Sequence, residues 1–177
     1  LVWSTYLGGS GTDVGEAIAT DRGGNVFVAL YTTSPDLPTK GSAAAGHNGD
    51  ADVYLAKLGT DGQIVWSTYL GGQGCDYVGD IAVDAEGNVW VVGSTDSTDF
   101  PVLAAQGKTQ TGAYDAFLAK FDSSGQLLAS LRLGGSRQDI ADGVALDEEG
   151  NVLVCGGTNS PDFPTSGSHS SSINGQY

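Results

Sequence analysis

Basic residues are scarce in this sequence. Seven lysines and arginines stand against 21 acidic residues, and the formal net charge is −14. Such a chain repels phosphate backbones and anionic lipid and has no basic stripe, so we expect no nucleic-acid partner. No stretch approaches the roughly 18 apolar residues that cross a membrane, so we expect no membrane insertion. The acidity either keeps the protein soluble or attracts divalent cations, above all calcium.

Cysteine is also scarce, and neither Cys75 nor Cys155 lies in a Cys-x-x-Cys or Cys/His cluster. A zinc site is therefore not expected, and the spacing neither demands nor excludes a disulfide between them. The sequence has no initiator methionine and no signal peptide, so we expect a mature fragment or part of a longer chain. It also lacks Gly-x-Ser-x-Gly, His-Glu-x-x-His and phosphate-binding motifs, so we expect no enzyme activity.

Glycine, in contrast, is abundant, with 28 residues, and 40% of the chain is hydrophobic. The chain is therefore globular, with many tight turns between short strands. An internal repeat organises it: the segment Leu-Val-Trp-Ser-Thr-Tyr-Leu-Gly-Gly at 1–9 returns almost unchanged at 64–72 and weakly at 127–135. Trp3 and Trp66 hold the same place in the repeat, which is 63 residues long.

Each repeat contains four strand-like runs, named a, b, c and d in chain order. In the first repeat they are 14–20, 25–31, 52–58 and 64–70. Several runs are apolar on both faces, which is typical of sheets stacked between neighbouring sheets. The sequence therefore predicts an all-β fold of four-stranded antiparallel sheets stacked as β-propeller blades.

The repeat also divides the chain into blades. Residues 1–13 would supply the last strand of a preceding blade, 14–76 and 77–139 two complete blades, and 140–177 an incomplete blade with two strands and a long loop. Propellers close with about four to eight blades. We therefore expect either part of a longer propeller or copies of the chain joined through unpaired strand edges.

In four motifs, the sequence resembles the bacterial β-propeller repeat family known as the SBBP repeat. They are Ser-Pro-Asp-Phe-Pro-Thr at 160–165, Asp-Ala-Phe-Leu-Ala-Lys at 115–120 and Trp-Ser-Thr-Tyr-Leu-Gly-Gly at 66–72, together with Gly-Asn-Val at the start of each b strand. The resemblance implies a secreted or cell-surface bacterial protein, often with many domains. It transfers no catalytic residues, and it implies surface binding or adhesion.

The connections differ in length at the two ends of the predicted blades. The a–b and c–d turns are short and lie at one end, whereas the b–c loops and d–a links are long and variable and lie at the other. Variable loops on a rigid scaffold are a usual place for binding. We call this end the long-loop face; it comprises residues 8–13, 32–51, 71–76, 94–114, 134–139 and 158–177.

Recurring carboxylates on this face are candidate calcium ligands. Asp13, Asp76 and Asp139 follow the Gly-Gly of each d–a link, and calcium needs about six to eight oxygen ligands, which loop carbonyls could complete. Asn48 and Asp50 supply alternating oxygens before strand c, but the glycine and distal glutamate of a calcium loop are missing. The alternative is that each aspartate accepts backbone N–H bonds and fixes its own turn.

Further candidates for ligand contact lie in the b–c loops. They are Asp36, Asp99, Asp162, Phe100, Tyr114 and Phe163. The aromatic residues could stack on a sugar, or the repeated Phe-Pro could plug the loop onto its blade. The leading hypothesis is a non-catalytic extracellular module that binds a protein or glycan through the long-loop face. The alternatives are a structural subunit joined by strand edges and a calcium-dependent propeller enzyme acting on glycans or phosphate esters.

Overall fold

The computed structural model describes residues 2–41, 45–103 and 112–167, and these fold into strands, turns and loops without any helix. Consequently, this part of the chain has no helix that could span a membrane. The first sheet contains β1 (Asp13–Thr20), β2 (Val26–Thr32), β3 (Asp52–Leu58) and β4 (Ile64–Leu70). The second contains β5 (Asp76–Val83), β6 (Val89–Thr95), β7 (Asp115–Phe121) and β8 (Leu127–Leu133), and the third β9 (Asp139–Leu146) and β10 (Val152–Thr158).

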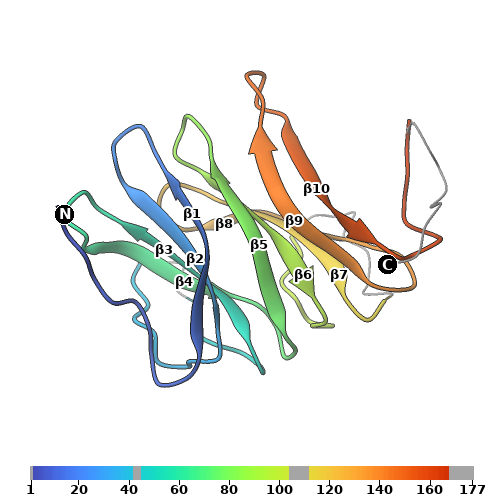
Figure 1. Ribbon diagram of the computed structural model, residues 1–177, viewed down its shortest axis with the longest axis horizontal. Helices are drawn as coiled ribbons and strands as arrows, with labels where there is room; N and C mark the ends of the chain where they lie inside the picture. Colours follow the sequence, from blue (N-terminus) through green and yellow to red (C-terminus); the bar gives the residue numbers. More distant parts are fainter. Residues whose placement is uncertain (1, 42–44, 104–111, 168–177) are drawn as a thin grey trace.

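Each sheet is antiparallel, with its strands in sequence order, and the strand register repeats from sheet to sheet. Asp13 pairs with Thr32 in the first sheet, Asp76 with Thr95 in the second and Asp139 with Thr158 in the third. The a strands β1, β5 and β9 lie side by side, and their a–b hairpins project together at the top of Figure 1. The three sheets are therefore the same unit repeated along the chain.

The a–b turns share one motif, in which an aspartate accepts hydrogen bonds from an asparagine four residues later. In the first a–b turn, Asp21 accepts hydrogen bonds from both the backbone and the side-chain nitrogen of Asn25 (2.9 and 2.7 Å). Gly24 closes this turn with φ of 78°, a conformation that favours glycine. Lys57 reaches the same carboxylate from β3, with Nζ 3.5 Å from Oδ2. A polar clamp thus joins the turn to a neighbouring strand.

The main core lies between the first and second sheets. Trp66 on β4 lies between Phe27 of its own sheet and Phe121 of the second, with ring centroids 6.1 and 6.4 Å away. Its indole Nε1 donates to the backbone oxygen of Ser123 in the c–d turn of the second sheet (3.1 Å). A Cβ on Gly125 would lie only 2.8 Å from the indole ring, so the turn must carry a glycine there. The d strand β4 thus docks on the next sheet through its tryptophan, whereas β8 carries Ala129 at the equivalent position.

Residues 2–9 differ from the sequence-based expectation, because no strand forms at this predicted d position. A strand requires a hydrogen-bonded neighbour, and none of the described residues provides one here. The tryptophan contact forms nevertheless, and Trp3 is partly buried against the first sheet. Its ring lies 3.0 Å from the position that a Cβ on Gly62 would take. The docking of the tryptophan therefore does not depend on strand formation.

Replacing Trp66 with alanine should lower the free energy of unfolding by about 3–5 kcal/mol, because it removes a buried aromatic ring from the junction of two sheets. Trp66 is 3% exposed. The matched control is Trp3→Ala, which removes the same side chain from a partly exposed position and should cost less. Urea denaturation followed by circular dichroism measures both. Equal losses in the two variants would contradict the role of the buried junction.

Candidate functional site at the long-loop face

The first residue of each a strand is the centre of a hydrogen-bond lattice. Asp76 accepts hydrogen bonds from the backbone nitrogen of Gly72 and from the hydroxyl of Ser97, both at 2.8 Å. Ser97 in turn accepts a hydrogen bond from the backbone nitrogen of Gly74 (2.9 Å). One carboxylate therefore fastens the d–a link to the start of the b–c loop. We call this arrangement the aspartate lattice.

The lattice recurs in the other two sheets. Asp13 accepts from Gly9, Thr32 and Ser34. The equivalent donors to Asp139 are Gly135, Thr158 and Ser160. Burial alone would raise the pKa of Asp13, but the three hydrogen bonds outweigh burial and lower it.

A second set of carboxylates, in the b–c loops, accepts hydrogen bonds from the backbone of the d–a links. The Oδ1 atoms of Asp36, Asp99 and Asp162 accept the backbone N–H of Ser10, Gln73 and Ser136, each at 2.8 Å. These contacts join residues 26 positions apart in the sequence. The recurring carboxylates therefore hold the loops of the long-loop face in fixed positions.

The predicted metal residues do not gather into one cluster. Asp13, Asp76 and Asp139 lie in three different lattices, where N–H and O–H groups donate to their carboxylates. The backbone nitrogen of Asn48 donates to Asp52 (2.6 Å), and that of Asp50 donates to the carbonyl of Gly74 (3.1 Å). Within the described ranges, no group of three or more His, Cys, Asp or Glu residues could hold a metal ion.

We expect calcium to leave the melting temperature unchanged, because hydrogen-bond donors already surround the lattice carboxylates. Differential scanning fluorimetry in millimolar calcium and in EDTA measures this, with Asp50→Asn as the variant of the blade-specific candidate. A rise in melting temperature with calcium that Asp50→Asn abolishes would contradict the prediction and establish a cation site there.

A pair of buried carboxylates lies beneath the lattice at the junction of the first two sheets. Asp52 and Asp76 are both fully buried, and a side chain on Gly71 would collide with Oδ1 of Asp52 and Oδ2 of Asp76. Among the described residues, no donor reaches Oδ1 of Asp52. Burial, with the charges of Asp76 and Asp99, raises the pKa of Asp52 to about 7, although the hydrogen bond from Asn48 opposes the shift. The same pairing recurs around Gly134, between Asp115 and Asp139.

The raised pKa of Asp52 makes stability depend on pH. The folded protein holds this proton up to about pH 7, whereas the unfolded chain releases it near the ordinary aspartate pKa of 3.8. The contribution of this group is therefore complete below about pH 4 and is lost as the pH rises through 7. Asp52→Asn should raise the free energy of unfolding at pH 8 by about 1–3 kcal/mol.

The matched control for this variant is Asp50→Asn, which neutralises an exposed carboxyl two residues away. Urea denaturation at pH 5 and pH 8 distinguishes the two substitutions. His47, whose Nε2 lies 3.9 Å from Asp52, remains present in both. A gain in stability at pH 8 that is the same for both variants would contradict the assignment to the buried pair.

Three tyrosines gather where the ends of β2 and β5 meet the long-loop face, and we call them the tyrosine cluster. The rings of Tyr31 and Tyr77 are stacked, with centroids 5.1 Å apart and planes at 7°, and the ring of Tyr114 lies 5.9 Å from that of Tyr77. Burial, with the charge of Asp96, raises the pKa of Tyr114. Tyr77 remains 39% exposed. The cluster therefore offers aromatic surface next to a carboxylate.

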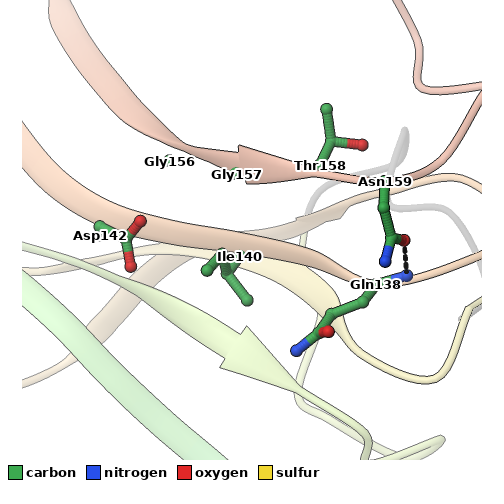
Figure 2. A pocket seen from close by; sticks show the side chains of 7 residues that line it. All are labelled: Gln138, Ile140, Asp142, Gly156, Gly157, Thr158 and Asn159. Atoms are coloured by element: carbon green, nitrogen blue, oxygen red, sulfur yellow. Dashed lines mark hydrogen bonds between the residues drawn. The ribbon is translucent and has the colours of Figure 1, made fainter. Parts of the chain in front are cut away.

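One hollow borders the tyrosine cluster, and a second adjoins it at Gln138. One, of about 320 Å³, is lined by Tyr77, Ser94, Tyr114 and Gln138. The other, of about 200 Å³, shares Gln138 and is shown in Figure 2. Its remaining lining residues are Ile140, Asp142, Gly156, Gly157, Thr158 and Asn159. Gln138 is held by its backbone N–H, which donates to Oδ1 of Asn159 (2.8 Å), so its side chain is left to line both hollows (Figure 2).

The two loop phenylalanines occupy different environments. Phe100 is 3% exposed and packs on Phe117, with ring centroids 4.8 Å apart. It therefore lies in the core rather than on the ligand face, because the loop folds it onto its own sheet. Phe163 is half-buried, and its backbone N–H bonds to Ser160. Tyr114, a candidate from the sequence, lies in the tyrosine cluster, whereas Tyr77 was not among the candidates because it lies inside a strand pattern.

A comparison with protein families shows what the repeated unit is. The model described as the SBBP β-propeller repeat matches residues 2–38, 65–101 and 130–164. These stretches make up more than half of the chain, and each contains one complete aspartate lattice. The chain belongs to the SBBP β-propeller repeat family. Its described strands form two sheets of four strands and one of two, and the family is one of β-propeller repeats.

One curated protein is similar to most of the chain. The chain is 26% identical over 167 residues to the regulatory protein FlaEY of Caulobacter vibrioides. The match covers 93% of this chain but only 17% of that protein. Nearly all of the SBBP segment is therefore similar to a small part of a much longer protein.

Proposed function

We propose that this SBBP segment is a non-catalytic, extracellular binding module that engages a protein or glycan partner through its long-loop face. The observation that carries the proposal is the aspartate lattice. It holds both kinds of connection at this end in fixed positions, while the residues between its anchor points vary from blade to blade. A rigid frame with variable residues lowers the entropic cost of binding.

The two ends of the blades differ in the surface that they offer. The long-loop face carries exposed aromatic surface at the tyrosine cluster. The opposite end has a hollow of about 500 Å³ between a–b turns. Five of its twelve lining residues are acidic, and Lys120 lies above the ring of Trp90 (4.6 Å). Aromatic residues are enriched at protein interfaces, whereas aspartate and glutamate are depleted there. This contrast favours the long-loop face.

The relative is compatible with a binding role, because a propeller segment within a regulatory protein would act by contacting a partner. The extracellular location follows from the resemblance to secreted repeats and fits the net charge of −14. Protease treatment of intact cells that produce the epitope-tagged parent protein tests the location. Full protection of the tag until the cells are lysed would contradict it.

Two threonines at opposite ends give a matched test of the binding face. Thr98 is exposed in a b–c loop, and Thr60 is exposed in a c–d turn. We expect Thr98→Arg to weaken binding several-fold, because its bulk and charge enter the proposed interface, and Thr60→Arg to leave binding unchanged. The measurement is binding of the labelled chain to an array of bacterial surface polysaccharides and extracellular matrix proteins.

Loss of binding in Thr60→Arg alone would contradict the choice of face. Failure of the unmodified chain to bind any probe on the array would contradict the binding role itself. Melting temperatures of both variants show whether either substitution disturbs the fold.

A structural subunit is the second candidate, and the edge of the third blade favours it. β10 pairs with β9 alone among the described strands, and Leu153 and Val154 on it are 55% and 48% exposed. An open apolar edge can pair with a strand of another copy. Light scattering over a range of concentrations separates the two candidates, since the binding module stays small and a subunit grows in mass.

A further inference from the structure

The tyrosine cluster is not needed to build an SBBP blade. The positions equivalent to Tyr77 hold Val14 in the first blade and Ile140 in the third. The positions equivalent to Tyr31 hold Ser94 and Gly157. Since the other blades form the same register without these tyrosines, the stacked pair serves something other than blade formation.

The cluster combines the two surfaces that a sugar ring needs. The aromatic rings offer apolar faces that pack against the C–H groups of a pyranose. The adjoining hollow also carries the amide of Gln138 and the hydroxyl of Ser94, which can both donate and accept hydrogen bonds. Its volume of about 320 Å³ lies at the lower end of small-molecule sites, which span about 300–1,000 Å³.

Charge selects among the sugars that could enter. None of the described residues that line the two hollows is Lys or Arg, whereas Asp142 lines one of them. Asp96 lies close enough for its charge to act on Tyr114. An anionic sugar, a phosphate ester or a sulfate would therefore meet only negative charge. A neutral sugar has hydroxyls that can donate to these carboxylates.

We infer, on the basis of the binding role proposed above, that the tyrosine cluster is a subsite for a neutral oligosaccharide. One pyranose ring lies against Tyr77, and its hydroxyls bond to Gln138 and Ser94. The second hollow continues from Gln138 past Ile140 to Thr158 (Figure 2), which gives room for an adjoining sugar. The site thus takes an oligosaccharide rather than a single sugar.

The test uses the whole chain with maltotriose and chitotriose as neutral probes and tri-galacturonic acid as the anionic control. Saturation-transfer difference NMR should detect at least one neutral trisaccharide, and no signal should arise from the anionic one. Tyr77→Ala should weaken the affinity about tenfold or more, the size of one aromatic contact. Tyr77→Phe should keep most of the affinity, because the ring remains.

Two further variants keep the test decisive if Tyr77→Ala disturbs the fold. Gln138→Ala removes a side chain that lines both hollows but leaves the backbone bond to Asn159, and it should also weaken binding. Tyr6→Ala removes a fully exposed tyrosine outside the cluster and should have no effect. Melting temperatures identify any variant that is unfolded.

The inference is overturned if neither neutral probe binds, or if both bind equally well to the parent chain, Tyr77→Ala and Gln138→Ala. Array binding that Thr98→Arg abolishes and Tyr77→Ala leaves intact would also overturn the inference, but it would support the proposed function. Absence of all array binding, in contrast, would remove the proposed function itself.

Discussion

The aspartate at the start of each a strand is the constraint on which the long-loop face depends. In each blade it faces the backbone of the preceding d–a link and the hydroxyls of the following b–c loop at the same time. Buried polar groups need partners, and here each group supplies what the other lacks. Two connections that are far apart in sequence thereby become one rigid surface.

Two buried carboxylates lie close together at the junction of the first two blades. Asp52 and Asp76 crowd the same glycine, and both are inaccessible to solvent. Two carboxylates in such a site cannot both ionise without cost, which is why burial and the neighbouring charges raise the pKa of Asp52. The junction is therefore held by a network that is most stable when one proton is retained within it.

The sequence predicted much of the fold because the repeat is regular. The predicted runs at 14–20 and 52–58 agree with β1 and β3 to within one residue. The d strand expected within residues 1–13 does not form over residues 2–9, because a pattern of residues records the propensity of a segment and not the presence of its neighbours. Trp3 nevertheless packs on the first sheet, because this contact needs only the glycine turn beneath the ring.

The candidate site was harder to predict than the strands. Repetition identified Asp13 and its equivalents as candidate ligands. A sequence pattern cannot show, however, whether a carboxylate oxygen binds a cation or accepts a hydrogen bond from an N–H group. Tyr77 went unselected because it lies within a strand, and only the packing of blade on blade brings it beside Tyr31. Phe100 looked available in its loop, yet the loop folds it inward. Contacts between blades carry this information, and a single repeat does not contain it.

The docking of Trp66 has a consequence for the order in which the protein is made. Its indole bonds to Ser123, 57 residues later in the chain. During synthesis on the ribosome, the first blade therefore emerges with its last strand unsealed and waits for most of its successor. Domains in general fold during synthesis from the N-terminus onward. Here completion of the first blade lags behind the growing end by most of one repeat, and until then its last strand is the least protected part of that blade.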